Sequence, residues 1–185
     1  MDKYTYEDKK GKSHTLQSNY THLVVFEKTG TNRYGAATGA VTLYGSGYGD
    51  KLAESAAFSS GAPGKGPVPE GTFKIRLDIR DVFDPGDLRQ GRAGIEASPF
   101  FGIQEIPQNV GGHDVRWEWG SIRARLNEPV GETRDTFLGH YLHGKTRLGD
   151  YTHGCIAERS EQVLKLLLQL DPKLTPVVPV DVRRK

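Results

Sequence analysis

The sequence has only one cysteine, Cys155, among its 185 residues. No disulfide can form within the chain, and the cysteine count leaves the redox compartment open. No apolar run is long enough to cross a bilayer, and the N-terminal residues lack the hydrophobic centre of a secretory signal peptide. The 25 basic and 23 acidic residues are spread along the chain, without a basic stripe interleaved with aromatics. We therefore expect no membrane span and no nucleic acid partner.

Glycine and proline, by contrast, are plentiful. The 23 glycines and 10 prolines separate many short segments, which is typical of a mainly β domain with frequent turns. The length suits one domain, and we expect an N-terminal hairpin or tail over 1–20 and a single domain over 21–185. Strands are predicted at 23–26, 40–44, 55–59, 72–79, 117–126, 137–143 and 177–182.

One segment has clear helical periodicity. Five leucines and a valine recur at helical spacing, which predicts one main helix over about 161–170. Ser160 is a suitable N-cap, and Pro172 marks the end of the helix. The loop-rich stretch 81–98 is predicted to be an insertion over the sheet, flanking the functional site.

The residues that could act in catalysis are concentrated between 143 and 156, a segment that reads HGKTRLGDYTHGCI. A thiol becomes a strong nucleophile as a thiolate, and a nearby imidazole is the usual means of forming one near neutral pH. Gly154 before Cys155 lets the backbone approach a substrate, so that backbone amides can stabilise an oxyanion. A buried structural cysteine is the alternative. The polar neighbours Thr152 and His153 favour the nucleophile.

Three histidines are candidates for the base. His143 ends a predicted strand, so its ring can face the loop of Cys155 from a rigid position, and we assign it as the base. His140 falls on the opposite strand face and is expected to make a structural hydrogen bond. His153, with Gly154 and Thr152, is predicted to line the oxyanion pocket. A zinc site built from the three histidines and Cys155 is an alternative, but the spacing is not that of a standard zinc motif, and we expect no metal.

The base needs an acceptor for the ring nitrogen that faces away from the sulfur. The carbonyl of Gly144 and the side chain of Asp150 are both candidates, although Asp150 also suits a plain turn. Tyr141 and the pair Trp117 and Trp119 are candidates to line a substrate groove, with a core position as the alternative. Three arginines are expected on the solvated surface, with contact to substrate carboxylates as the alternative: Arg123, Arg125 and Arg134.

Chain order narrows the class of cysteine enzyme. Papain-like and NlpC-type peptidases place the cysteine before the histidine, whereas no histidine follows Cys155. Sortases have the histidine first, but far from the cysteine and with a different cysteine motif. The pattern that remains is a histidine closely followed by a Ser/Thr-x-Gly-Cys turn.

The segment THGCI at 152–156, preceded by His143-Gly144, resembles the signature of the YkuD-type L,D-transpeptidases, which remodel bacterial peptidoglycan. A second segment, GPVPEGTFKI at 66–75, resembles the strand entry of that family. The resemblance covers about residues 41–170. It implies a mainly β fold, an L,D-transpeptidase-like twisted β-sandwich with one main flanking helix, and no cofactor.

The resemblance also implies an acyl-transfer reaction on peptidoglycan stem peptides. Cys155 would attack the carbonyl that is linked to a terminal D-Ala, and His143 would protonate the departing amine. Amides around His153, Gly154 and Cys155 would hold the oxyanion. The thioester would then pass to a diaminopimelate amine, a free D-amino acid or water. These acceptors correspond to transpeptidation, exchange and carboxypeptidase activity.

Two departures from the family pattern affect the expected role. The interval from His143 to Cys155 is shorter than in housekeeping members, and Ala157 stands where those often carry an arginine that holds substrate. Arg159 is the candidate replacement. The short interval, the opening hairpin and the missing signal peptide are more similar to L,D-transpeptidase-type effectors of type VI secretion.

Such an effector is made in the cytoplasm and secreted to act in the periplasm of a target bacterium. Its partners, besides stem peptides, are a secretion apparatus and a cognate immunity protein. Two alternatives stay open. One is a non-catalytic peptidoglycan-binding or adaptor domain, and the other is a cysteine peptidase that acts on a protein substrate.

Overall fold

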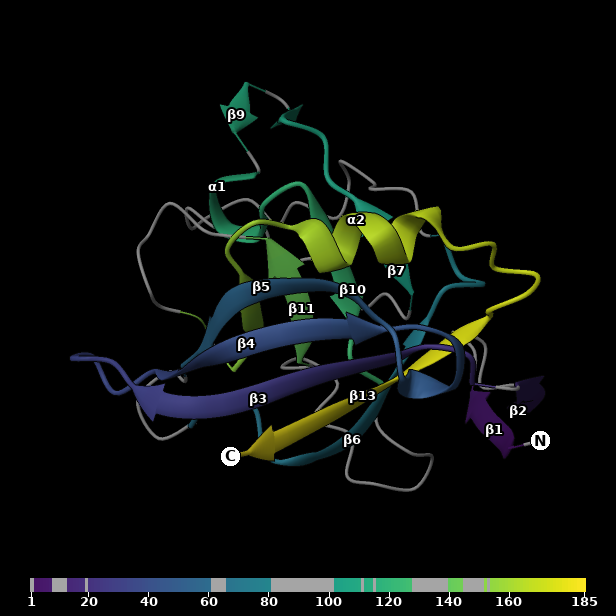
Figure 1. The fold of residues 1–185 in the computed structure, drawn as a ribbon. Helices are drawn as coiled ribbons and strands as arrows, with labels where there is room; N and C mark the ends of the chain where they lie inside the picture. The colour runs from purple at the N-terminus through teal and green to yellow at the C-terminus, as the bar shows by residue number, and fades with distance from the viewer. Residues whose placement is uncertain are drawn as a thin grey trace.

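The computed structural model describes residues 2–7, 13–18, 20–60, 66–80, 102–110, 112–114, 116–127, 140–144, 152 and 154–185. Nine strands form one sheet in the order β6-β13-β3-β4-β5-β12-β11-β10-β7. Their bounds are β3 Leu23–Thr31, β4 Ala37–Tyr44, β5 Lys51–Ser59, β6 Gly71–Arg76, β7 Ile103–Glu105, β10 Ile122–Arg125, β11 Tyr141–Gly144, β12 Ile156–Glu158 and β13 Val177–Arg184. The prediction of a mainly β fold with one main helix is confirmed (Figure 1).

The remaining elements are short. β1 Asp2–Glu7 and β2 Ser13–Ser18 pair antiparallel where the sequence predicts a hairpin. β8 Asn109–Val110 pairs with β9 His113–Asp114, and η1 Ser46–Tyr48 lies between β4 and β5. The two α-helices of the described residues are α1 Arg116–Trp119 and α2 Gln162–Gln169.

The nine-stranded sheet curls until its ends approach each other. β6 is bridged to Asn127, two residues after the end of β10, because the amides of Lys74 and Asn127 each donate to the other's carbonyl, at 2.9 and 2.8 Å. Arg80 and Ile103 form a second bridge near β7. The two layers of the expected sandwich are therefore parts of one nearly closed sheet.

Helix α2 packs on the inner face of this sheet. Figure 1 shows it alongside β5, and it also contacts β4, β10 and β11. Val163, Leu164 and Leu167 are fully buried and join the apolar core that the alternate residues of the strands form. Burial of an amphipathic face is what stabilises so short a helix, because helix propensity alone is insufficient at this length.

The predicted N-cap of this helix is wrong. Glu161, not Ser160, occupies the N-cap position, with a left-handed φ of 56° and no capping side-chain bond. The orphan amides of the first turn instead reach the carboxylate of Glu158 on β12, with Val163 donating at 2.8 Å and Leu164 at 3.0 Å. Tertiary structure supplies the acceptor that the local sequence was expected to supply.

The prediction of a strand through Trp117 and Trp119 is also wrong, because these residues belong to the helical turn α1. The Asp114 carboxylate accepts the Arg116 amide at 3.1 Å, and the Gly120 amide closes the turn on the Arg116 carbonyl at 3.0 Å. The Asp114 carboxylate at the start of the turn and Gly120, with a φ of 68°, at its end therefore favour a helical turn, although the tryptophans alternate as in a strand.

The other predicted strands differ from the observed ones mainly in length, whereas four short strands were not predicted: β7, β8, β9 and β12. β3, β4 and β13 are longer than predicted, and β6 is shorter, because the Leu77 amide turns to the Pro176 carbonyl at 2.8 Å. Of the predicted strand 137–143, the structure describes only Tyr141–Gly144 as a strand, and residues 137–139 lie outside the described residues. The predicted loop 81–98 also lies outside them.

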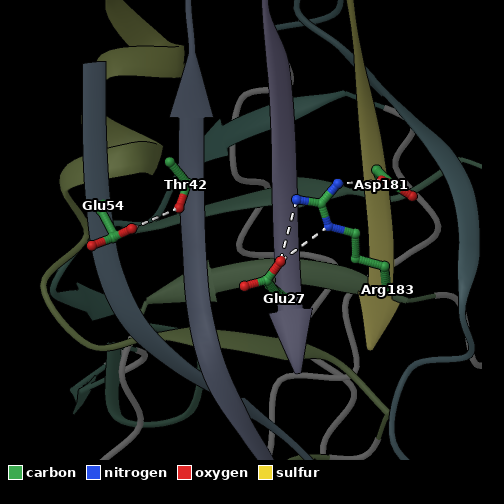
Figure 2. Close-up of polar contacts among 5 residues, drawn as sticks. All are labelled: Glu27, Thr42, Glu54, Asp181 and Arg183. Atoms are coloured by element: carbon green, nitrogen blue, oxygen red, sulfur yellow. Dashed lines mark hydrogen bonds and ion pairs between the residues drawn. The ribbon is translucent and has the colours of Figure 1, made fainter. Parts of the chain in front are cut away.

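The outer face of β13, β3, β4 and β5 is polar. Figure 2 shows Arg183 reaching across to Glu27, with an N–O distance of 3.2 Å, while Thr42 donates to Glu54 at 3.2 Å. The side chain of Arg183 is half exposed, so this ion pair contributes only about 0–1 kcal/mol to stability.

Candidate active site

The two residues predicted to carry the chemistry, Cys155 and His143, project from one face of neighbouring strands. β11 and β12 run parallel, with Leu142 opposite Ile156 and His143 opposite Ala157. Leu142 and Ile156 are fully buried in the core. Side chains alternate along a strand, so His143 and Cys155, each one residue away, lie on the opposite, outer face. The parallel register therefore brings the base and the thiol to one surface.

The imidazole of His143 is oriented by a neighbouring carbonyl. Its Nδ1 lies 2.7 Å from the Gly144 oxygen. A carbonyl can only accept, so Nδ1 carries the proton and Nε2 is left as the basic nitrogen. The structure thus contains the contact expected of Gly144, whereas Asp150, the other candidate, lies outside the described residues.

Trp119, from the helical turn α1, packs against both candidates. Its ring meets those of His143 and Tyr141 edge to face, with both pairs of centroids 5.3 Å apart. Tyr141, Cys155 and Trp119 form a small apolar cluster that is separate from the main core. The sequence placed Trp119 on a strand and among the candidates to line a substrate groove, whereas the structure places it on α1, against His143 and Tyr141.

The loop that carries Cys155 is held by Ser60, a residue that the sequence reasoning missed. The Ser60 amide donates to the Thr152 hydroxyl at 3.0 Å, and the Thr152 amide donates to the Ser60 hydroxyl at 2.6 Å. The Thr152 hydroxyl also lies 2.8 Å from the Cys155 carbonyl. Both side chains are buried, so these bonds restrain the backbone on either side of the nucleophile. Thr152 therefore holds the loop.

Gly154 has a left-handed φ of 94°, a region that favours glycine. Its amide donates to the Ser60 carbonyl at 2.5 Å, and its carbonyl lies 2.7 Å from Nδ1 of His140. His140 thus makes a structural hydrogen bond, as expected. Because the Gly154 amide is already bonded, an oxyanion at Cys155 would need other amides in this conformation, such as that of Cys155.

Glu161 is a second residue near the base that the sequence did not indicate. Its carboxylate accepts both the amide of Ser121, at 2.7 Å, and the Ser121 hydroxyl. The same carboxylate packs directly on Gly144, where an added Cβ would overlap it. Because residue 144 is a glycine, the start of α2 can pack closely against β11, in which the Gly144 carbonyl orients His143.

The candidate base is uncharged at neutral pH. Burial lowers the pKa of His143 to about 4, the hydrogen bond with Gly144 acts in the opposite direction, and the positive charge of Arg123 lowers the pKa further. Only 3% of the residue is exposed, so water cannot stabilise an imidazolium. The neutral ring is the form that can accept a proton.

The thiol is also uncharged before substrate binds. Burial raises the pKa of Cys155 to about 11, while a backbone hydrogen bond from Tyr141 and the charges of Arg125 and Arg123 act to lower it. The resting pair is therefore a thiol and a neutral imidazole, which differs from the thiolate expected from the sequence. The proton must leave during the attack.

The other predicted residues are placed as follows. Tyr141 lies beside Cys155, and Arg159 is exposed, with its guanidinium carbon 5.8 Å from the centroid of the Phe58 ring. His153 lies outside the described residues. Within the described ranges, no three His, Cys, Asp or Glu residues are grouped to hold a metal ion. No helix in the same ranges is long and apolar enough to cross a membrane.

Comparison with known proteins identifies one family. Residues 16–178 match the model of the L,D-transpeptidase catalytic domain, YkuD. No curated protein and no solved structure gave a match. The matched residues contain both Cys155 and His143 and the sheet from β3 to the first residues of β13. This chain therefore belongs to the YkuD family of L,D-transpeptidase catalytic domains.

Proposed function

We propose that the protein is a peptidoglycan-modifying cysteine enzyme that acts on stem peptides at the bond between an L-centre and a terminal D-Ala. Membership of the family supports peptidoglycan as substrate and acyl transfer as reaction class. The observation that carries the proposal for this chain is the placement of Cys155 on the same sheet face as His143, whose Nε2 is left basic. A binding module has no use for an oriented base beside a thiol.

The first half of the reaction uses the neutral pair. His143 Nε2 takes the thiol proton while the sulfur of Cys155 forms a bond to the carbonyl carbon of the L-centre. The tetrahedral intermediate then collapses, the C–N bond to D-Ala breaks, and the imidazolium gives its proton to the leaving amine. The products are a thioester on Cys155, neutral His143 and free D-Ala.

The second half transfers the acyl group to an acceptor. A diaminopimelate amine gives a cross-link, a free D-amino acid gives exchange, and water gives trimming. In each case His143 removes a proton from the acceptor and returns it to the sulfur, so the same two residues serve all three outcomes. The acceptor that reaches the thioester therefore decides the product.

We further propose that the protein is an antibacterial effector, delivered by a secretion apparatus to the periplasm of a target bacterium and countered by a cognate immunity protein. The 12-residue step from His143 to Cys155 and the N-terminal hairpin of β1 and β2 support this role. Expression in a Gram-negative host should arrest growth when the chain is directed to the periplasm and not when it stays in the cytoplasm. Equal growth in the two compartments, or toxicity retained by Cys155→Ala, would count against an enzymatic effector.

The enzymatic proposal is tested with purified peptidoglycan and soluble tetrapeptide muropeptides. The wild-type protein should release D-Ala, exchange it for an added D-amino acid or form new cross-links, all detectable by mass spectrometry. Cys155→Ala should leave the muropeptides unchanged, because no thioester can form. The balance of the three products shows which acceptor the enzyme uses.

The same assay separates the two rival functions. A protein-directed cysteine peptidase would cleave polypeptides made only of L-residues and leave the muropeptides intact. A binding domain would retain muropeptides without changing their mass, equally well in wild type and Cys155→Ala. Either result would overturn the proposed function.

A further inference from the structure

Two arginines lie beside the catalytic pair on the outer face of the sheet. β10 runs antiparallel to β11, with Arg123 opposite His143 and Arg125 opposite Tyr141. The alternate residues of β10 are buried in the main core, so both arginine side chains project from the face that carries His143. Cross-strand neighbours on one face are close enough to interact.

Arg125 is held against the aromatic residue that packs with the nucleophile. Its guanidinium carbon lies 5.0 Å from the centroid of the Tyr141 ring, and Tyr141 packs with Cys155. The side chain is only partly buried, so a substrate can reach it. In the described part of the chain, no carboxylate forms an ion pair with Arg125. A guanidinium of this kind is suited to bind an anion with two parallel hydrogen bonds.

Arg123 supplies a second, buried positive charge on the same face of the sheet. It is only 1% exposed, and its Nε donates to Gln104 Oε1 at 2.7 Å. Its guanidinium carbon also lies 4.8 Å from the centroid of the Trp119 ring. These contacts fix its position, which contradicts the solvated surface expected for it. The charges of both arginines also lower the pKa of the Cys155 thiol, which places them within electrostatic reach of the sulfur.

We propose that Arg125, backed by the charge of Arg123, binds the free carboxylate of the residue that leaves when Cys155 is acylated. The inference rests on the proposed function and adds to it the residue that binds the terminal carboxylate of the donor. That carboxylate is only a few bonds from the carbonyl that Cys155 attacks, so a cation beside the sulfur is in position to meet it. Donors that continue beyond this residue, or that carry an amide there, lack the charge that Arg125 recognises.

The specificity is measured with two donors that differ at one group. One is a tetrapeptide ending in D-Ala with a free carboxylate, and the other ends in the D-Ala carboxamide. We expect wild type to favour the free acid by about 10- to 100-fold in kcat/KM, the range of a charge-assisted bidentate contact. Arg125→Gln should lose most of this preference because kcat/KM for the free-acid donor falls, while kcat/KM for the carboxamide donor changes by less than about threefold.

Two further variants control the comparison. Arg125→Lys keeps the positive charge but lacks the planar pair of N–H donors, and it should retain part of the preference. Arg183→Gln removes an exposed arginine on β13, four strands from β12 in the sheet order, and should leave both donors unchanged. Equal losses on both donors in Arg125→Gln, or no preference in wild type, would overturn the inference.

A second readout does not depend on peptidoglycan. Cys155 is alkylated with iodoacetate and with iodoacetamide, and the iodoacetate rate is divided by the iodoacetamide rate. The same ratio measured for glutathione serves to normalise it. An anion site beside the sulfur should raise this normalised ratio by about 5- to 10-fold in wild type, and Arg125→Gln should return it toward one. If the ratio falls in the variant but neither donor is turned over, the carboxylate site stands and the proposed function fails. If both donors react and the ratio does not change, the function stands and this inference fails.

Discussion

Replacing His143 by glutamine is expected to lower kcat for release of D-Ala by about 10²–10⁴-fold, the usual contribution of a general base. Glutamine has a similar reach, but its amide does not accept a proton near neutral pH. The thiol of Cys155 has a pKa raised to about 11 by burial, so it cannot ionise without that acceptor. KM should change little, because His143 acts on the transferred proton and not on the bound donor.

The loss must be separated from damage to the fold. Alkylation of Cys155 by iodoacetamide at about pH 10 provides the control, since about a tenth of a thiol with a pKa of about 11 is then ionised by hydroxide, without the help of His143. The variant should match wild type there within a few-fold. A kcat within tenfold of wild type would contradict the assignment of His143 as base, and a comparable loss of alkylation would indicate a structural defect instead.

The pH profile of the wild-type enzyme follows from the same pair. The base works only when it is unprotonated, and burial lowers the pKa of His143 to about 4. Activity should therefore fall on the acid side near pH 4, well below the value of about 6.5 for an exposed histidine. An acid limb near pH 6.5 would show that His143 is solvated in the working enzyme.

Replacing Glu158 by alanine is expected to reduce the free energy of unfolding by about 3 kcal/mol. The carboxylate is fully buried and accepts the amides of Val163 and Leu164 in the first turn of α2. Alanine would leave both amides without their acceptor and open a void beneath the helix. Urea denaturation followed by circular dichroism measures the loss.

Glu158→Gln is the matched comparison. The amide oxygen retains one acceptor, while its NH₂ group faces a backbone donor, so we expect a loss of about 1–2 kcal/mol. Burial raises the pKa of Glu158, and the charge of Glu161 acts in the same direction, against the amides that lower it. If alanine costs less than glutamine, the carboxylate does not cap α2, and the cost of burying it dominates.

Local patterns in the sequence were sufficient for the long strands, the main helix and the chemical class, but not for the helical turn α1 or the short strands β7 and β12. Strand alternation and helical spacing depend on which residues are apolar, and that information is local. The segment from the His-Gly pair to the THGC turn is likewise local. Within 13 residues it contains the nucleophile Cys155, the base His143 and the Gly144 carbonyl that accepts from the His143 ring. For this reason, the position of the helix and the family were predicted correctly before any fold was known.

Only the tertiary structure decided how the site is supported and charged. Ser60 and Thr152 are 92 residues apart, and Glu161 reaches Ser121 across 40 residues, so no local pattern connects them. The protonation states of Cys155 and His143 depend on burial, which arises only when the strands are assembled. The register of β10 against β11 then places Arg123 and Arg125 beside the pair, because alternation along a strand assigns a face but not the neighbour on the next strand.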